Sequence, residues 1–482
     1  MRAIRFPMTA VAVSLLVTAG FFAAPLAQAS GSHPARSAHP RWRTAIEVPG
    51  TGKLNVGGNA DVASVSCPSA GNCAAGGAYT HGGTQAFVVT TRRGTWRKAI
   101  EVPGSGGLEG SGGFAQINVV SCASSGNCSA GGSFGNGSRT EFGPMVVSER
   151  HGRWKKATQV PGMSKFGALG FASVDAISCA SPGNCAAGGS YAASGSTREA
   201  FVVSQHDGTW SKAVSVPGTA KLNTEGVADV NSVSCPAAGN CVAGGYYDIS
   251  SGSQPYLVEL HHGTWAEAIQ VKGLTALGAT GGIVESISCP SAGNCVAGGQ
   301  YTDTSGDGHA FVVTQRKGSW GKAVQVPGTA ALDTGGHAAT YAVSCAAVGN
   351  CAAAGAYFNT SGRQAWVASE RKGKWSKAIE VPGFAALNSG ELGAAYSVSC
   401  GRPGFCAAGG VYRSGPGTEA FVVSERNGRW GKAIEVPGLG KLNTQGNATI
   451  NSVSCSGIAF CAAGGNYFDK SSHFQAFVAD QK

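Results

Sequence analysis

A pair of cysteines separated by five residues recurs eight times in this chain of 482 residues and restricts what the chain can fold into. A run of small residues follows the second cysteine of each pair, as in the segment from Cys235 to Gly245. From one copy to the next the first cysteine moves by 55, 57, 56, 54, 56, 55 and 55 residues. A repeat of this length predicts a β-propeller or a solenoid.

Each copy contains four strand-like runs. In the first copy these are residues 63–67, 73–79, 85–91 and 96–102, which are rich in small, β-branched and aromatic residues and are separated by glycine-containing turns. Four short antiparallel strands per repeat are typical of a propeller blade, whereas a solenoid would need a shorter period or helices. The predicted fold class is therefore all-β, a single eight-bladed β-propeller with four antiparallel strands per blade.

The two ends of the repeat array complement each other. The eighth copy ends at Lys482 without the tryptophan strand that completes the other seven copies. A matching strand stands near the start of the chain, where residues 42–50 (WRTAIEVPG) resemble residues 430–438 (WGKAIEVPG). We expect this N-terminal strand to close the last blade, because closure removes the free sheet edges of an open array.

The first residues have the order of a secretory signal peptide. Arg2 and Arg5 precede an apolar run, and small residues follow it up to Ala29. We predict a signal peptide over residues 1–29, a flexible leader over residues 30–40 and the propeller over residues 41–482. The mature chain is expected to be a secreted, extracellular monomer without a membrane span, because the apolar run is short and no second one follows.

The cysteines predict a disulfide framework. In an exported chain an even number of cysteines at fixed spacing indicates disulfides, and pairing within each copy is the simplest connectivity. Zinc is the alternative, but the CxxC spacing and the partner histidines of zinc sites are missing. All sixteen cysteines fall into the pairs Cys67–Cys73, Cys122–Cys128, Cys179–Cys185, Cys235–Cys241, Cys289–Cys295, Cys345–Cys351, Cys400–Cys406 and Cys455–Cys461, which leaves none as a nucleophile.

Two motifs resemble those of known propeller families. The doublet Gly76-Gly77, followed at a distance by Trp96, resembles the kelch pattern, and residues 204–210 (SQHDGTW) resemble an Asp-box turn of sialidase-type propellers. The repeat as a whole resembles secreted bacterial β-propeller repeat proteins. The resemblance implies a propeller fold rather than sialidase activity, because most copies replace the Asp-box aspartate, with Arg93, His151, Lys317, Lys372 and Asn427.

The candidate binding surface is the face that carries the longer loops. If the first strand of each blade is innermost, the cysteine turns and the Gly-x-Trp turns share one face, and the loops after Val-Pro-Gly and after an aromatic position share the other. The aromatic residues are Tyr79, Phe134, Tyr191, Tyr247, Tyr301, Tyr357, Tyr412 and Tyr467. Such rings can stack on sugars, and packing between blades is the alternative. The loop face also carries Asn55, Asn223, Asn388 and Asn443, and the arginines Arg139, Arg198, Arg363 and Arg413.

One loop has part of a metal-binding pattern. Asp303, Ser305 and Asp307 have the spacing of the first half of a calcium loop. The distal glutamate of such a loop is missing, because Thr314 stands at that position. An ordinary polar turn is therefore the alternative, and no cofactor other than calcium is expected.

The sequence favours a binding function over catalysis. The formal net charge of +10 falls to +8 without Arg2 and Arg5, and the remaining basic residues are spread along the repeats, which does not favour nucleic-acid binding. We predict multivalent, non-catalytic binding of a glycan or cell-envelope polymer through the loops of one face. A protein-binding platform and a sialidase-like, glycan-processing hydrolase are the alternatives. A hydrolase needs a carboxylate pair, and no spacing selects one among Asp61, Asp175, Asp229, Glu285 and Glu391.

Overall fold

The computed structural model describes residues 41–110, 112–137, 142–166, 171–193, 197–457 and 460–481. These residues lie in one compact unit, Pro40–Lys482. The predicted signal peptide and leader lie outside the described residues, and so does Arg139. Among the helices that the structure describes, none combines the length and the apolar character needed to cross a membrane.

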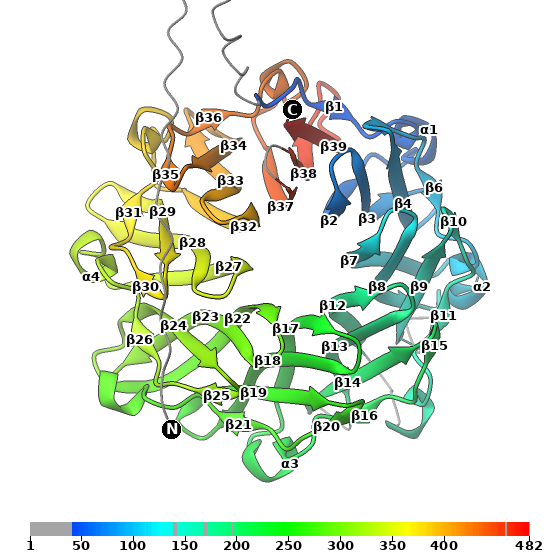
Figure 1. Ribbon diagram of the computed structural model, residues 1–482. Coiled ribbons are helices and arrows are strands. Elements are labelled where there is room, and N and C mark those ends of the chain that lie inside the picture. Colours follow the sequence, from blue (N-terminus) through cyan, green and yellow to red (C-terminus); the bar gives the residue numbers. More distant parts are fainter. Residues whose placement is uncertain are drawn as a thin grey trace, which may run out of the picture. The chain divides into compact units, whose positions relative to one another are not determined.

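Eight antiparallel sheets form a ring, as the repeat predicts, and each sheet is one blade (Figure 1). The innermost strands surround the axis and are β2 (Asp61–Ser69), β7 (Phe114–Ser124), β12 (Ala172–Ser181), β17 (Ala228–Ala237), β22 (Ala279–Ser291), β27 (Ala339–Ala347), β32 (Ala394–Arg402) and β37 (Thr449–Ser456). The second strands are β3 (Asn72–Thr80), β8 (Asn127–Gly135), β13 (Asn184–Ala192), β18 (Asn240–Ile249), β23 (Asn294–Asp303), β28 (Asn350–Asn359), β33 (Phe405–Ser414) and β38 (Phe460–Phe468).

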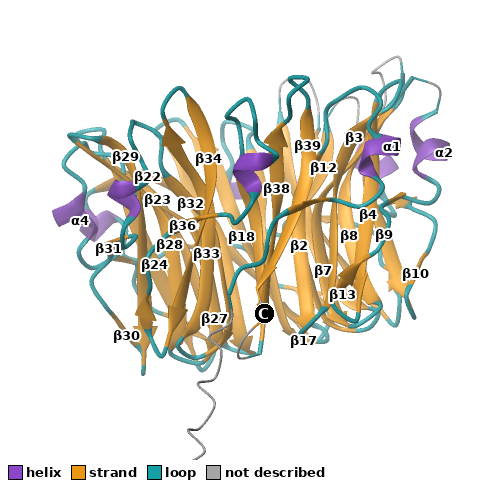
Figure 2. Ribbon diagram, turned by 90° about the horizontal axis from the view of Figure 1, so that it is seen from above, coloured by secondary structure: helices purple, strands orange, loops and turns teal. Residues whose placement is uncertain are grey.

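The third strands lie farther from the axis. They are β4 (Thr84–Arg92), β9 (Phe142–Arg150), β14 (Arg198–His206), β19 (Gly252–His261), β24 (Gly308–Arg316), β29 (Gly362–Arg371), β34 (Gly417–Arg426) and β39 (Phe474–Gln481). Short helical turns follow the Val-Pro-Gly segments and gather toward one face of the ring, which we call the loop face (Figure 2). They are α1 (Thr51–Leu54), α2 (Ser105–Glu109), η1 (Met163–Phe166), α3 (Thr219–Leu222), η2 (Thr275–Leu277), α4 (Thr329–Leu332), η3 (Phe384–Ala386) and η4 (Leu439–Lys441).

The outer strand of each blade is broken in two, where the sequence predicts one continuous strand. In the first blade β5 (Thr95–Trp96) and β6 (Ile100–Glu101) both pair with β4. The corresponding segments are β10 (Arg153–Trp154) and β11 (Thr158–Gln159), β15 (Thr209–Trp210) and β16 (Val214–Ser215), β20 (Thr264–Trp265) and β21 (Ile269–Gln270), β25 (Ser319–Trp320) and β26 (Val324–Gln325), β30 (Lys374–Trp375) and β31 (Ile379–Glu380), and β35 (Arg429–Trp430) and β36 (Ile434–Glu435).

At the break, one backbone N–H group of the outer strand donates a hydrogen bond to the neighbouring blade. The N–H of Ala99, which lies between β5 and β6, donates to the carbonyl oxygen of Pro49 in the preceding blade at 2.7 Å. The same bond, at 2.6–2.8 Å, joins every pair of adjacent blades: Ala45 to Pro437, Ala157 to Pro103, Ala213 to Pro161, Ala268 to Pro217, Ala323 to Lys272, Ala378 to Pro327 and Ala433 to Pro382. An outer ring of hydrogen bonds therefore runs around the whole propeller.

A second ring of hydrogen bonds joins the innermost strands. The serine before each first cysteine accepts a hydrogen bond from the backbone N–H of the next blade's first cysteine, as when Cys122 donates to Ser66 at 2.9 Å. The other seven bonds, at 2.9–3.0 Å, join Cys67 to Ser454, Cys179 to Ser121, Cys235 to Ser178, Cys289 to Ser234, Cys345 to Ser288, Cys400 to Ser344 and Cys455 to Ser399. The repeated serine is thus a connector between blades.

We expect Ser66→Ala to lower the free energy of unfolding by about 1 kcal/mol, because it leaves the Cys122 N–H group without its acceptor. Ser64→Ala removes the acceptor of the Val120 N–H group in the same way, so we expect a similar loss there. Denaturant titration measures both losses. Unchanged stability of the Ser66→Ala protein would contradict its role as a connector.

The N-terminal strand closes the ring, as the match between the two ends predicts. Strand β1 (Ile46–Glu47) pairs with β39, so that Ile46 faces Val478, and Trp42 forms a further bridge to Gln481 (Figure 1). The last blade is therefore built from both ends of the described chain.

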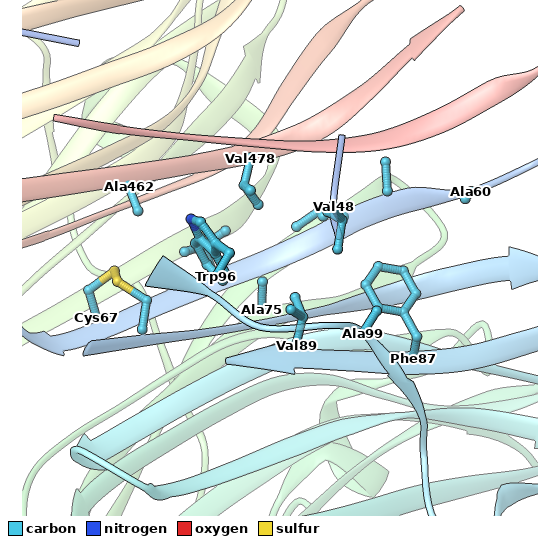
Figure 3. Close-up of a cluster of buried hydrophobic side chains, with 14 of the residues drawn as sticks. Val48, Ala60, Cys67, Ala75, Phe87, Val89, Trp96, Ala99, Ala462 and Val478 are labelled. Atoms are coloured by element: carbon cyan, nitrogen blue, oxygen red, sulfur yellow. A yellow bond between two sulfur atoms is a disulfide. The ribbon is translucent and has the colours of Figure 1, made fainter. Parts of the chain in front are cut away.

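Disulfides join all eight predicted cysteine pairs. The turn that each disulfide bridges lies beside the tryptophan turn of the same blade, because the Gly94 N–H donates to the Gly71 carbonyl oxygen at 2.8 Å. These turns define the second face of the ring, the cysteine face. Small, β-branched and aromatic side chains fill the space between blades, as where Val478 of the last blade meets Trp96 and Val89 of the first (Figure 3).

The tryptophan turns explain the departures from the Asp-box. In all seven turns a residue with positive φ precedes a glycine with positive φ, for example Asp207 at 45° and Gly208 at 84°. Arg93 and Lys317 adopt the same backbone at 53° and 49°. The turn thus forms with different side chains at its first position, provided that glycine follows.

Candidate functional site

The aromatic positions that the sequence offers as ligand platforms lie in the core. The seven tyrosines are only 1–4% exposed and Phe134 is 8% exposed. Several of the phenol groups bond to the outer strand of their own blade, as Tyr357 does to Glu380 at 2.8 Å. The faces of these rings contact protein rather than solvent, so their burial favours the packing alternative.

The loop-face asparagines hold neighbouring loops together. The Asn55 side chain donates to the Phe474 carbonyl oxygen of the last blade at 3.1 Å and accepts from the N–H groups of Asn59 and Thr80. Asn388 and Asn443 accept from loop backbone in the same way and donate to the preceding blade, while Asn223 accepts from Val227 and donates to Glu199. Both the amide N–H group and the amide oxygen of these asparagines are therefore engaged within the protein.

The calcium-like loop is a closed polar turn. Asp303 Oδ1 accepts from the backbone N–H groups of Ser305 and Asp307 at 2.8 and 3.1 Å, and Oδ2 lies 2.9 Å from His309 Nε2. The side-chain hydrogen bond from His309 holds the pKa of Asp303 below its usual value. Among the described residues, no group of three or more His, Cys, Asp or Glu side chains is placed to hold a metal ion.

The structure reveals a ring of variable residues that sequence spacing had not selected as a site. Each innermost strand has a β-bulge four residues before its first cysteine, where one residue has no partner on the second strand. The residues at the bulge form what we call the bulge ring: Ala63, Asn118, Asp175, Asn231, Glu285, Tyr341, Tyr396 and Asn451. Aligning the eight copies on their cysteines would have shown that this position varies between blades.

Several bulge-ring side chains reach the innermost strand of the next blade. Asn231 Nδ2 donates to the Val284 carbonyl oxygen of the next blade at 2.9 Å, and Asn451 donates to that of Val62 at 3.0 Å. Asn118 Nδ2 lies 3.3 Å from Asp175 Oδ1. Because the innermost strands surround the axis (Figure 1), these contacts place the variable side chains along the inner edge of the ring.

An aromatic cluster, formed by Tyr341, Tyr396 and Arg363, occupies the sixth and seventh blades. The two rings are tilted, with centroids 5.8 Å apart. The guanidinium carbon of Arg363 lies 5.5 and 5.7 Å from these two centroids, and its Nη2 donates to the Tyr341 hydroxyl at 2.8 Å. All three side chains are half-buried, so the cluster is ordered by its own contacts and still reaches solvent.

An acidic cluster, formed by Asp175, Asp229, Arg198 and Tyr246, occupies the third and fourth blades. Arg198 Nη2 lies 3.7 Å from Asp229 Oδ2 and donates to the Tyr246 hydroxyl. Burial and the nearby Asp229 charge raise the pKa of Asp175 to about 6, and burial also raises the pKa of Asp229. Asp229 Oδ1 and Arg198 Nε are buried and have no hydrogen-bond partner within the described structure.

The two clusters contain some of the arginines and carboxylates that the sequence offers as candidate site residues. Arg198 and Arg363 hold the same position in their blades, at the start of the third strand, and each bonds to a tyrosine hydroxyl. Arg413 lies apart and donates to the Pro416 carbonyl oxygen at 3.3 Å. Of the five scattered carboxylates, the structure brings Asp175 and Asp229 together.

Comparisons with known proteins are informative for the fold alone. No protein-family model and no curated protein matches the chain. Among solved structures, Chaetomium thermophilum Sqt1 is similar over 91% of this chain and 97% of its own, with 9% identity and a TM-score of 0.51. The Hadza microbial sialidase Hz136 matches 82% of this chain and 72% of its own, with 12% identity and a TM-score of 0.34. An ulvan lyase of polysaccharide lyase family PL25 matches 90% and 95%, with 10% identity and a TM-score of 0.42.

Proposed function

We propose that this protein binds a glycan or cell-envelope polymer at the bulge ring, without changing it chemically. The observation that carries the proposal is the arginine that lies beside two tyrosine rings, Arg363 with Tyr341 and Tyr396. Aromatic faces stack on the apolar faces of sugars, and a guanidinium gives charge-assisted hydrogen bonds to hydroxyl and carboxylate groups. A half-buried cluster of these groups suits a saccharide.

The acidic cluster is proposed as a second contact for the same polymer. Its carboxylates accept hydrogen bonds from sugar hydroxyls, and Arg198 and Tyr246 offer donors beside them. The two clusters lie three blades apart on one ring, so a polymer that engages both gains avidity. The bulge-ring residues differ from blade to blade. We therefore propose two polymer contacts instead of the eight equivalent contacts that the repeat suggests.

We expect Arg363→Ala to weaken binding of an oligosaccharide prepared from bacterial cell walls at least about tenfold, which corresponds to about 1.4 kcal/mol. The reason is that the substitution removes the cation and the hydrogen bond that order Tyr341. Calorimetric titration measures the affinity. Arg413→Ala is the matched control, because the Arg413 guanidinium group donates to the Pro416 carbonyl oxygen of its own loop and belongs to neither cluster. Unchanged affinity in a folded Arg363→Ala protein would contradict the proposal.

Hydrolysis is the second candidate function, and the raised pKa of Asp175, about 6, favours it. A carboxyl group with such a pKa is suited to act as a general acid near neutral pH. The test is release of new reducing ends from the bound oligosaccharide. Release that Asp175→Asn abolishes, while binding remains, would replace the binding proposal with a hydrolase.

A further inference from the structure

A cavity on the cysteine face lies between the first and second blades. Its volume is about 510 Å³, whereas the equivalent crevices between blades two and three, five and six, and seven and eight each measure about 10 Å³. The interface between the first and second blades is therefore more open than these three equivalent interfaces. A cavity of this size accommodates a small ligand.

The lining of this cavity includes a side chain that is shorter than its equivalents in the other blades. Thr91 lies at the end of the third strand of the first blade, and the other blades have larger residues there: Glu149, Gln205, Leu260, Gln315, Glu370, Glu425 and Gln481. The pairing between the second and the third strand also ends earlier beside the cavity. In six blades it pairs the second cysteine with this residue, but in the first two blades it ends one pair sooner, at Ala74 with Thr90 and at Ser129 with Ser148.

The arginine that covers this crevice at other interfaces does not cover it here. Arg371 forms an ion pair with the buried Glu425 at 3.5 Å and lies against Gly428, where a Cβ atom would overlap its guanidinium group. Arg316 is placed in the same way over Gly373. At the cavity, Arg92, Glu149 and Gly152 occupy the corresponding sequence positions, yet a Cβ atom on Gly152 would meet nothing within 4 Å.

The lining of the cavity is basic around one buried carboxyl group. Arg92, Arg97, Arg153 and His151 are exposed around it, and Glu149 is only 3% exposed. Burial raises the pKa of Glu149 to about 7. Below that pH the Glu149 carboxyl is neutral and can donate a hydrogen bond, so it does not oppose an anion held by the arginines.

We propose that this cavity is a second binding site, for a ligand that carries one oxyanion on a hydroxylated carbon skeleton, such as a sugar acid or a polyol phosphate. The three guanidinium groups bind the oxyanion, since arginine forks match carboxylate and phosphate geometry. Glu149 and the Thr90 side chain are available to the hydroxyl groups. The lining of the cavity shares no residue with the bulge-ring clusters, so this site is independent of the polymer site proposed above.

Calorimetric titration of the full mature chain with glucuronate and with glycerol 3-phosphate tests this site. We expect one site per chain for at least one of the two probes, and no binding of glucose, which lacks the anion. Arg97→Ala and Arg153→Ala should each weaken the binding at least tenfold. The probe that binds more tightly identifies the source of the oxyanion as a carboxylate or a phosphate ester.

Thr91→Gln should abolish binding, because it installs the larger side chain that stands there in other blades. Lys155→Ala is the matched control, since Lys155 corresponds to Arg97 but belongs to the next interface, where the crevice measures about 10 Å³. Binding of these probes at the cavity should persist in the Arg363→Ala protein, because Arg363 belongs to the bulge-ring clusters and not to the lining of this cavity. Absence of binding by both probes would overturn the proposal. So would unchanged affinity in the two arginine variants, which replace exposed side chains and keep the test valid if Thr91→Gln does not fold.

Discussion

A chain that begins at Pro49 is expected to lose more than about 5 kcal/mol of unfolding free energy relative to one that begins at Arg41. The deletion removes Trp42, Ala45 and Val48, which are 8%, 4% and 0% exposed in the cores on either side of the last blade. Loss of one buried tryptophan side chain alone costs about 3–5 kcal/mol. Denaturant titration of the two chains, both with intact disulfides, measures the loss.

The same deletion exposes the edge of β39. In the closed ring, the N–H groups of Arg43 and Val48 donate to the carbonyl oxygens of Asp480 and Ala476 at 2.8 and 2.9 Å. A free edge of this length pairs with other chains, so we expect the shortened protein to form oligomers in size-exclusion chromatography. Adding a peptide of residues 41–50 should reverse the association. A monomeric shortened chain with unchanged stability would show that closure contributes little.

The fold could be predicted because its determinants are local and repeated. Strand alternation, glycine turns and the cysteine spacing all describe one blade, and the repeat count then gives the number of blades. The match of residues 42–50 to residues 430–438 was sufficient to predict closure. The break in the outer strand could not be predicted from alternation, because it coincides with a bond from Ala99 to Pro49 in another blade.

The candidate site was less accessible to sequence reasoning for a physical reason. The tyrosine positions were candidate ligand platforms because they repeat regularly. In a propeller, however, repetition marks side chains that pack between blades. The aromatic and acidic clusters depend on what differs between copies, namely Asp175, Tyr341 and Tyr396. Their meeting also depends on a bulge, which shifts the pairing after Thr340 and Ala395, and on arginines that reach across from the third strand.

The bulge also explains the second glycine of the Gly-Gly doublet, and substituting it should be severely destabilising. In the seventh blade this residue is Gly410, which pairs with Ala395 beside the bulge at Tyr396. A Cβ atom on Gly410 would overlap the carbonyl oxygen of Ala394 and approach the Tyr396 nitrogen to 3.0 Å. These are backbone atoms that no rotamer change can move, so we expect Gly410→Ala to cost about 3 kcal/mol or more.

The neighbouring glycine is the matched control. A Cβ atom on Gly409 would meet only side-chain atoms of Ile450 and Val453, each at 3.1 Å, and these can shift by a few tenths of an ångström. The sixth blade already has Ala354 at this position and retains Gly355 at the second, and Ala354 packs in one core with the small Ala395. Denaturant midpoints should therefore fall much further for Gly410→Ala than for Gly409→Ala.

The two substitutions also distinguish an effect on stability from an effect on the candidate site. The reason is that Gly410 pairs beside the bulge at Tyr396, and Tyr396 belongs to the aromatic cluster. If the bulge positions the binding side chains, folded Gly410→Ala protein at low temperature should bind the cell-wall oligosaccharide more weakly, as Arg363→Ala does, while Gly409→Ala binds normally. Equal midpoints for the two variants would contradict the steric account. Normal oligosaccharide binding by Gly410→Ala would instead mean that the bulge is needed for the fold alone.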